Sequence, residues 1–175
     1  RSIDSLADFV ESLPASRQRL IGITGPPGAG KSTVADALVA RLGSAVVLPM
    51  DGYHLPHARL VELGRRDRMG APDTFDVDGF LGTLAALRDF HNSCNPVFAP
   101  GFDRGIEEPV PGAIPILQEL ATVVVEGNYL LYGEHGWGGV RPLLDATFFV
   151  RVDRGIRQRR LIERHMRFGK SPVDA

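Results

Sequence analysis

The stretch Gly25-Pro26-Pro27-Gly28-Ala29-Gly30-Lys31-Ser32 fits the pattern G-x-x-x-x-G-K-[S/T] of a phosphate-binding P-loop. An apolar stretch at 20–24 precedes it, and a stretch with helical spacing at 33–42 follows. The glycines allow backbone N–H groups to converge on one point, and the following helix adds the positive end of its dipole. A glycine-rich turn before an ordinary helix is the alternative interpretation, and the complete motif in this strand–loop–helix setting argues against it.

The motif gives a role to each of its polar side chains. The Lys31 ammonium is expected to reach the β- and γ-phosphates of a nucleoside triphosphate, and the Ser32 hydroxyl to bind Mg²⁺. Since no Asn-Lys-x-Asp guanine signature occurs in the sequence, we predict ATP and Mg²⁺ as the cofactors. The predicted nucleotide-binding residues are Gly25, Gly28, Ala29, Gly30, Lys31, Ser32 and Thr33.

Length and composition are those of one globular domain. The 175 residues are 43% apolar and 23% charged, which suffices for a single core. A formal net charge of −1 gives no general attraction to nucleic acid or to an anionic membrane, and no apolar run approaches the roughly 20 residues of a membrane span. The single cysteine, Cys94, excludes an internal disulfide. We expect a cytoplasmic protein that binds neither nucleic acid nor membranes. The sequence is compatible with a homodimer.

The order of apolar segments predicts an α/β fold. Buried strands are expected at 20–24, 45–50, 122–125 and 147–152, and helices at 3–13, 33–42, 77–91 and 154–168. Continuous apolar strands separated by helices indicate a parallel sheet with helices on both faces, here of the P-loop NTPase type. We expect one domain over residues 1–175, with a Pro- and Gly-rich insert at about 92–115 on the substrate side. Extended segments around Val97 and Phe98 of this insert are expected to form a hairpin.

Two carboxylates follow predicted strands and are expected to share one edge of the sheet with the P-loop. Asp51 follows the strand at 45–50, and Glu126 follows the strand at 122–125. Ligands of parallel sheets bind at the carboxyl ends of the strands. An aspartate in a turn before glycine is a common alternative for Asp51, and the neighbouring P-loop favours a functional role. Glu126 is predicted to bind Mg²⁺ or its coordinated water.

A basic stripe lies on the last predicted helix, formed by Arg157, Arg160, Arg164 and Arg167, and Lys170 follows it. Such a stripe is often no more than a solvated cationic face. Because it has few acidic neighbours and follows the last strand, we favour a basic helical lid over the nucleotide, at about 154–172. A lid arginine would stabilise negative charge in a phosphoryl-transfer transition state.

Several runs occur in an order that resembles the phosphoribulokinase/uridine kinase family of P-loop kinases. They are the P-loop, Asp51-Gly52-Tyr53-His54, Ala71-Pro72-Asp73-Thr74-Phe75-Asp76 and Glu126-Gly127. The sequence is most similar to a branch described as fructose-transport-system kinases or nucleoside/nucleotide-kinase-like proteins. The further runs that resemble this branch are Phe102-Asp103-Arg104, Glu107-Glu108-Pro109, Arg164-His165 and Phe168-Gly169-Lys170-Ser171-Pro172. The likeness extends over nearly the whole chain from Leu20 onward.

The resemblance implies roles for individual positions. Asp51 falls where the family has a general base, Asp73 falls in the segment that contacts acceptor hydroxyls, and Arg160 and Lys170 fall among the basic residues of the lid. Uridine kinases carry a tyrosine and a histidine in the hairpin where this sequence has Phe98 and Asp103. The residues expected to act in catalysis are Asp51, Lys31 and Arg160. Those expected to bind the acceptor are Tyr53, His54, Asp73, Phe98, Asp103, Arg164 and Lys170.

We therefore expect an ATP-dependent kinase that transfers the γ-phosphoryl group to a hydroxyl of a sugar, nucleoside or similar metabolite. A nucleotide-dependent regulatory ATPase or switch, which has no small-molecule acceptor, is the alternative. The polar segment 51–76 favours the kinase, because it offers more groups that could bind hydroxyls than nucleotide binding requires.

Overall fold

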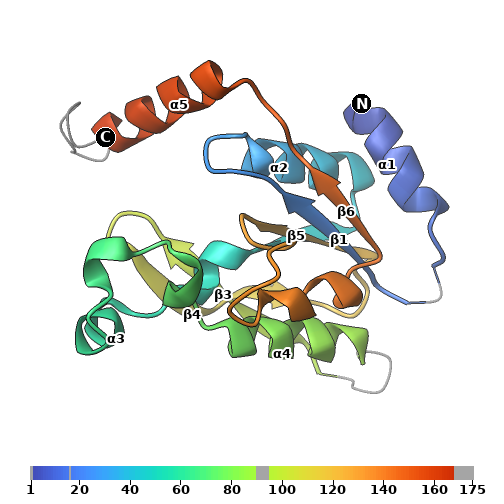
Figure 1. The fold of residues 1–175 in the computed structure, drawn as a ribbon. Coiled ribbons are helices and arrows are strands. Elements are labelled where there is room, and N and C mark those ends of the chain that lie inside the picture. The colour runs from blue at the N-terminus through green and yellow to red at the C-terminus, as the bar shows by residue number, and fades with distance from the viewer. Residues whose placement is uncertain (1, 16, 90–94, 168–175) are drawn as a thin grey trace.

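The computed structural model describes residues 2–15, 17–89 and 95–162 with their side chains, and the helical backbone of residues 163–167. The helices and strands follow the predicted order (Figure 1). The strands are β1 (Arg19–Thr24), β2 (Ala45–Pro49), β3 (Val97–Asp103), β4 (Glu108–Ile116), β5 (Thr122–Gly127) and β6 (Ala146–Phe149). The α-helices are α1 (Ile3–Ser12), α2 (Lys31–Leu42), α3 (His57–Glu62), α4 (Val77–Arg88) and α5 (Arg154–Arg167). Short 3₁₀ turns are η1 (Met50–Tyr53), η2 (Arg66–Arg68), η3 (Pro72–Thr74), η5 (Trp137–Gly139) and η6 (Arg141–Leu143).

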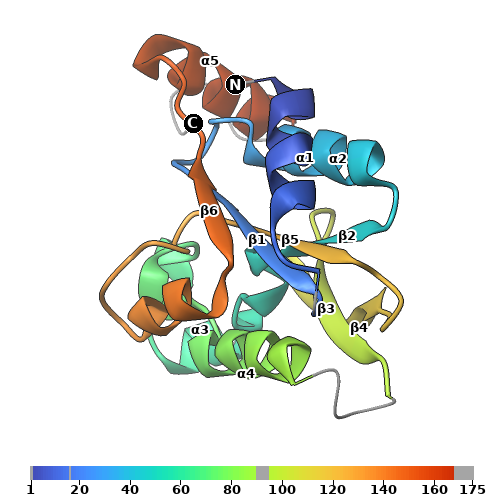
Figure 2. The same cartoon turned by 90° about the vertical axis from the view of Figure 1, so that its right-hand side faces the viewer.

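Four parallel strands form the central sheet, in the order β2-β5-β1-β6. Every residue of β5 is buried, as are five of the six residues of β1, because helices cover both faces of the sheet (Figure 2). The register aligns Ile23 with Glu126 and Pro49 with Glu126. The P-loop, Glu126 and the residues after β2 therefore lie at one edge of the sheet, as predicted.

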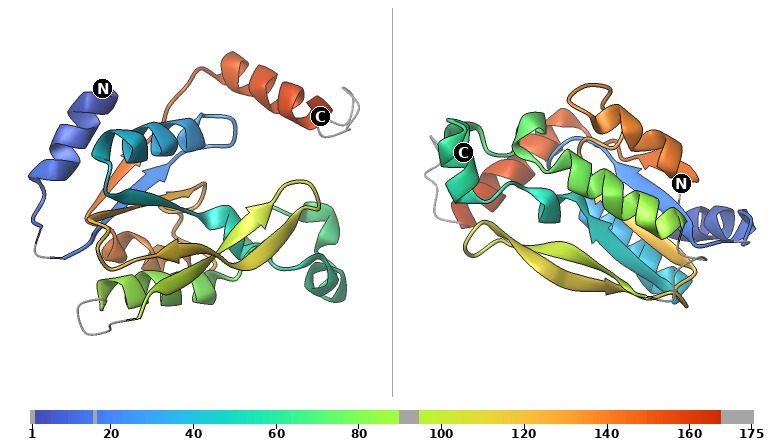
Figure 3. Two further views of the ribbon diagram at one scale, coloured as in Figure 1. Left: turned by 180° about the vertical axis from the view of Figure 1, so that it is seen from behind. Right: turned by 90° about the horizontal axis from the view of Figure 1, so that it is seen from below.

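Side chains of the sheet alternate between two apolar clusters. One face packs Ile21, Ile23 and Val124 against α1 and α2. The opposite face packs Val123 and Val125 against α4, η1 and the hairpin of β3 and β4, and Figure 3 shows this second layer from behind and from below. Two cores, one on each face, are what the continuous apolar strands predict.

The hairpin is longer than the sequence suggests. Strands β3 and β4 pair antiparallel from Val97 opposite Ile116 to Asp103 opposite Glu108. The Pro- and Gly-rich composition predicts short extended segments around Val97 and Phe98, and strands of this length were not expected. A two-stranded ribbon consists of edge strands, where proline is tolerated, and this accommodates Pro109 and Pro115 within β4.

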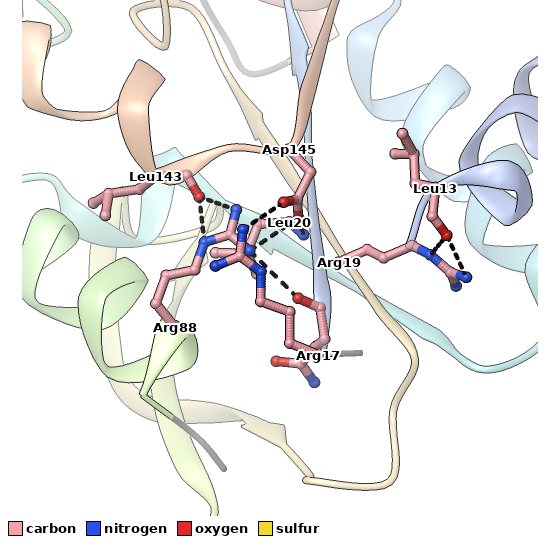
Figure 4. Close-up of polar contacts among 8 residues, drawn as sticks. Leu13, Arg17, Arg19, Leu20, Arg88, Leu143 and Asp145 are labelled. Carbon is pink, nitrogen blue, oxygen red and sulfur yellow. Dashed lines mark hydrogen bonds and ion pairs between the residues drawn. The ribbon is translucent and has the colours of Figure 1, made fainter. Parts of the chain in front are cut away.

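An ion-pair network ties the elements together at the other end of the sheet (Figure 4). The Asp145 carboxylate accepts a hydrogen bond from the Leu20 backbone N–H at 2.8 Å and pairs with Arg88 at 2.9 Å and Arg17 at 3.1 Å. Arg88 also donates from Nε to the Leu143 carbonyl at 2.7 Å. The network joins β1, α4 and the start of β6.

None of the described helices is long and apolar enough to cross a membrane.

Candidate nucleotide-binding and phosphoryl-transfer site

The P-loop joins β1 to α2, and two of its glycines have left-handed backbone conformations. The φ angles are +76° at Gly28 and +89° at Gly30, a region that residues with a side chain rarely adopt. Gly30 is the N-cap of α2, and no side chain among the described residues caps this helix start. The first N–H groups of α2 are therefore oriented toward the loop, where they suit an anion.

A cavity of about 480 Å³ opens along this loop, within the size range of small-molecule sites. Its lining is Gly28, Ala29, Gly30, Lys31, Ser32, Thr33, Val34, Val152, Arg160 and Leu161. All the predicted nucleotide-binding residues except Gly25 line it. Arg160 and Leu161, from α5, also line the cavity, and Figure 1 shows α5 next to the P-loop.

Helix α5 packs directly on the P-loop. A Cβ atom added to Gly28 would lie 3.0 Å from the Arg157 carbonyl oxygen and 3.0 Å from Cγ of Leu161. The Nε atom of Arg157 is buried and has no hydrogen-bond partner among the described residues. Because a buried donor without a partner is unfavourable, an orphaned N–H beside the P-loop fits the presence of an anionic ligand.

Lys31, Ser32 and Glu126 meet at the start of α2. Nζ of Lys31 lies 3.8 Å from Oε1 of Glu126, and the Ser32 hydroxyl donates to Oε2 of Glu126 at 3.3 Å. Burial raises the pKa of the Glu126 carboxyl, and the positive charge of Lys31 opposes this rise. A hydroxyl beside a carboxylate provides hard oxygen ligands, which suit Mg²⁺.

Magnesium would need further oxygen ligands at this site. Within the described residues there is no group of three or more His, Cys, Asp or Glu side chains that could hold a metal ion. Mg²⁺ in phosphoryl-transfer sites uses one or two protein oxygens and completes its shell with water and substrate phosphates. Ser32 and Glu126 fit this pattern.

Asp51 lies at the same edge, in the 3₁₀ turn η1 that follows β2. Its Oδ2 pairs with Nη2 of Arg104, from the hairpin, at 3.0 Å. Burial is the main cause of the raised pKa of Glu126. The negative charge of Asp51 raises this pKa further, and the positive charge of Arg104 lowers it. Asp51, Arg104, Glu126 and Lys31 thus form one group of interacting charges beside the P-loop.

Comparison with models of protein families gives no match. The chain is 39% identical over 131 residues to the ATP-dependent kinase-like protein notR' of Aspergillus versicolor, covering 72% of this chain and 76% of the relative. It is 34% identical over 170 residues, 90% of this chain and 70% of the relative, to a Schizosaccharomyces pombe protein assigned as a uridine kinase. A solved structure from Silicibacter sp. TM1040, assigned as a fructose transport system kinase, matches with a TM-score of 0.90 and 32% identity over 99% of this chain and 85% of its own.

These similarities extend over most of each chain and agree with the geometry of the P-loop site. The protein belongs to the phosphoribulokinase/uridine kinase family of P-loop kinases. The resemblance noted in the sequence is confirmed, as is the α/β fold of the P-loop type. ATP-dependent relatives also support nucleotide use by this P-loop kinase.

Three of the residues predicted to bind the acceptor line a second cavity of the kinase, of about 420 Å³, between η1, α4 and the hairpin. Tyr53 is buried, and its hydroxyl donates to Thr83 at 2.8 Å. The His54 ring lies against the rings of Phe75 and Phe102, with interplanar angles of 40° and 39°. Phe98 is 61% exposed. The structure brings Tyr53, His54 and Phe98 together, and their contact with an acceptor remains a prediction.

The ring of His54 is oriented by the backbone of the predicted base. Its Nδ1 lies 2.7 Å from the Asp51 carbonyl oxygen, and a carbonyl only accepts hydrogen bonds, so Nδ1 carries the proton. Burial lowers the pKa of His54 against the opposing influence of this hydrogen bond. The ring is therefore neutral at pH 7, and its Nε2 is an acceptor for a donor such as a hydroxyl.

Two other predicted acceptor residues, Asp73 and Asp103, do not line that cavity. Asp73 accepts two hydrogen bonds from Arg68 and lies 3.5 Å from Nε of Arg65. Asp103 accepts from the Gly105 N–H at 2.7 Å, within the hairpin turn. Both carboxylates thus have partners inside the protein. The side chain of Arg164 and the whole of Lys170 lie outside the described residues, so their roles stay predictions.

Arg104 is the site residue that sequence reasoning missed. It stood within the Phe102-Asp103-Arg104 run, where Asp103 received the predicted role. The residue has no local signal of its own, because its partner Asp51 is 53 positions away along the chain. Arg65 and Arg68, the partners of Asp73, were missed for the same reason: a charged loop segment does not indicate which carboxylate each arginine contacts.

Proposed function

We propose that this protein is an ATP-dependent small-molecule kinase. It transfers the γ-phosphoryl group to a hydroxyl of a sugar, nucleoside or similar metabolite, with Asp51 as general base. The observation that carries the proposal is the grouping of Lys31, Ser32, Glu126 and Asp51 at one edge of the sheet, beside a cavity of nucleotide size. A phosphate clamp together with a base for the acceptor hydroxyl is the equipment of a kinase.

The chemical step uses residues of this chain in distinct roles. Asp51 takes the proton from the acceptor hydroxyl while the hydroxyl oxygen bonds to the γ-phosphorus. The bond from that phosphorus to the bridging oxygen breaks, and its electron pair leaves with ADP. Lys31 and Arg160 stabilise the negative charge on the transferring group. Ser32 and Glu126 would hold Mg²⁺, which would neutralise charge at the phosphates.

The acceptor side extends from η1 toward the hairpin and Asp73. His54 offers Nε2 to a hydroxyl, and Asp73 and Asp103 offer carboxylates to paired hydroxyls. Phe98 supplies apolar contact. Arg164 and Lys170 complete the basic lid, and the acceptor is a polyhydroxylated metabolite. The assigned names of the relatives, a uridine kinase and a fructose transport system kinase, support a kinase without agreeing on one acceptor.

The test is ADP release from ATP and Mg²⁺ with and without a panel of sugars, nucleosides and pantothenate-like alcohols. A kinase shows turnover that depends on one of these acceptors and yields a phosphorylated product by mass spectrometry. A regulatory ATPase or switch shows the same ADP release with every acceptor and with none, and this result would reject the proposal.

The role of Asp51 is tested separately with Asp51→Asn. Loss of a general base lowers kcat by about 10²–10⁴-fold, while ATP binding, measured by calorimetry, stays intact. A decrease of only a few-fold would make Asp51 a turn residue.

A further inference from the structure

The ion pair between Arg104 and Asp51 connects the hairpin to the predicted general base. Arg104 Nη2 lies 3.0 Å from Asp51 Oδ2, and the two side chains are 47% and 26% exposed. An exposed ion pair between two mobile side chains contributes little by itself. Its importance here depends on how firmly the hairpin and η1 are held together.

Two residue pairs hold the hairpin against η1 and α3. A Cβ atom on Gly52 would lie only 2.1 Å from the Pro100 carbonyl oxygen, so the two backbones touch where a side chain does not fit. The Glu108 carboxylate accepts from the His57 backbone N–H at 3.1 Å and lies 3.2 Å from Nδ1 of the same residue. The turn itself is fixed by Asp103, which accepts from Gly105 N–H. Arg104 is thus presented to Asp51 from a braced loop.

The charge of Arg104 also acts on the neighbours of Asp51. The positive charge of Arg104 acts on Asp51 and on Glu126, which lie at the same edge of the sheet. Burial is the main cause of the lowered pKa of His54, and Arg104 lowers it further. A cation at this position therefore offsets the repulsion between two carboxylates that the sheet edge brings together.

We infer that Arg104 is a positioning residue, which holds the Asp51 carboxylate in place for the acceptor hydroxyl through their ion pair. This inference rests on the proposed function, and it adds a residue of the hairpin to the catalytic apparatus. A general base must lie within hydrogen-bond reach of the proton that it accepts, and misplacement of such a group by about 1 Å can reduce the rate about 10²-fold.

The experiment is a double-mutant cycle with the variants Arg104→Gln, Asp51→Asn and their combination. Arg66→Gln is the matched control. Arg66 is 44% exposed, similar to Arg104, and it lies 4.0 Å from Glu107, which has no predicted catalytic role. Acceptor-dependent kcat, the KM values, ATP affinity and melting temperature are measured for each variant.

Arg104→Gln is expected to lower kcat by about 10- to 100-fold, with ATP affinity and melting temperature close to the wild type. Arg66→Gln should retain wild-type kcat. In the Asp51→Asn background, Arg104→Gln should reduce kcat by less than about threefold, because residues that act together are not additive. A purely structural role of Arg104 would not give this dependence on Asp51.

Three results would overturn the inference. They are an unchanged kcat in Arg104→Gln, an increased kcat, which would mean that Arg104 blocks the base, and an equal loss with and without the Asp51 carboxylate. Absence of acceptor-dependent turnover in the wild type would reject the proposed function and this inference with it. Wild-type turnover that Arg104→Gln leaves intact would reject the inference alone.

Discussion

The Lys31 ammonium and the Glu126 carboxylate lie 3.8 Å apart, with side chains only 8% and 11% exposed. Lys31 Nζ also donates to the Pro26 carbonyl at 3.3 Å, within the P-loop. A phosphate that enters the loop would share the lysine with Glu126, and a cation beside Ser32 would share the glutamate with Lys31. The pair thus connects the two predicted cofactors.

Lys31→Ala should weaken ATP binding and nearly abolish turnover, because it removes the point charge expected to contact the transferring phosphate. Arg41→Ala is the control, since it removes a cation at the other end of α2, where Arg41 pairs with Asp4 at 3.1 Å. Calorimetry with ATP and ADP release report the two effects. Near-wild-type turnover in Lys31→Ala would contradict the prediction.

Glu126→Gln should raise the Mg²⁺ concentration that gives half-maximal activity, because a hard cation prefers a charged oxygen ligand. Burial raises the pKa of Glu126 above 4.5, so falling pH protonates it before ordinary carboxyls. The wild-type Mg²⁺ requirement should therefore rise as the pH approaches 4.5 from above, and Glu126→Gln should lack that part of the pH dependence. Identical magnesium titrations for both proteins at each pH would make Glu126 structural.

Arg160→Ala should lower kcat with little change in ATP affinity, since a lid arginine acts mainly on charge that develops in the transition state. Arg159, an exposed neighbour on α5, provides the control Arg159→Ala. If ATP affinity falls and kcat is unchanged, Arg160 binds the ground-state phosphates instead.

Asp73→Ala should raise the KM of the acceptor and leave the KM of ATP unchanged, because carboxylates are strong acceptors for sugar hydroxyls. The pKa of Asp73 lies below its ordinary value, mainly because Arg68 donates hydrogen bonds to the carboxylate. Asp73 therefore stays ionised at neutral pH. Arg68→Ala separates direct contact from bracing of the loop. Equal effects of Asp73→Ala and Arg68→Ala would show that Asp73 acts only through its arginine partner.

Asp145→Asn should destabilise the fold by about 1–2 kcal/mol, because it weakens charge-assisted hydrogen bonds from Arg88 and the Leu20 N–H. Burial raises the pKa of Asp145, yet those hydrogen bonds and the arginine charges outweigh burial and hold it below 3.8. A depressed acid pKa contributes stability above the unfolded value, and this stability is lost as pH falls through the folded value. Denaturant unfolding at pH 7 and at about pH 3 should show a smaller difference between the two proteins at the lower pH.

Most of the fold could be predicted from the sequence because its determinants are local. Continuous apolar runs give β1, β2 and β5, and the P-loop has a complete pattern of eight residues. The carboxyl-end rule for parallel sheets then places Asp51 and Glu126 near the P-loop.

Features that depend on distant pairs could not be predicted. Arg104 meets Asp51, and Glu108 meets His57, across 53 and 51 positions, and neither pair leaves a periodic pattern. The length of the hairpin was hidden by its prolines, whose effect depends on whether a strand is central or at an edge. The partners of Asp73 were hidden because the segment 65–68 contains three arginines with no local sign of which carboxylate each one contacts.

Within the described residues, the hairpin of β3 and β4 forms a sheet of its own and shares no strand pairing with the parallel sheet. Its backbone at Pro100 contacts the backbone of Gly52 in η1, with no room for a side chain between them. The hairpin and the parallel sheet are therefore joined by packing, with Ala99 and Ile116 in the same apolar cluster as Val123 and Val125, and the described residues show no strand ladder between them. Replacing residues 97–116 with the corresponding segment of a relative is thus a route to altered acceptor choice that leaves the phosphate-handling strands untouched, and such exchange gives evolution a means to diversify this kinase by modules.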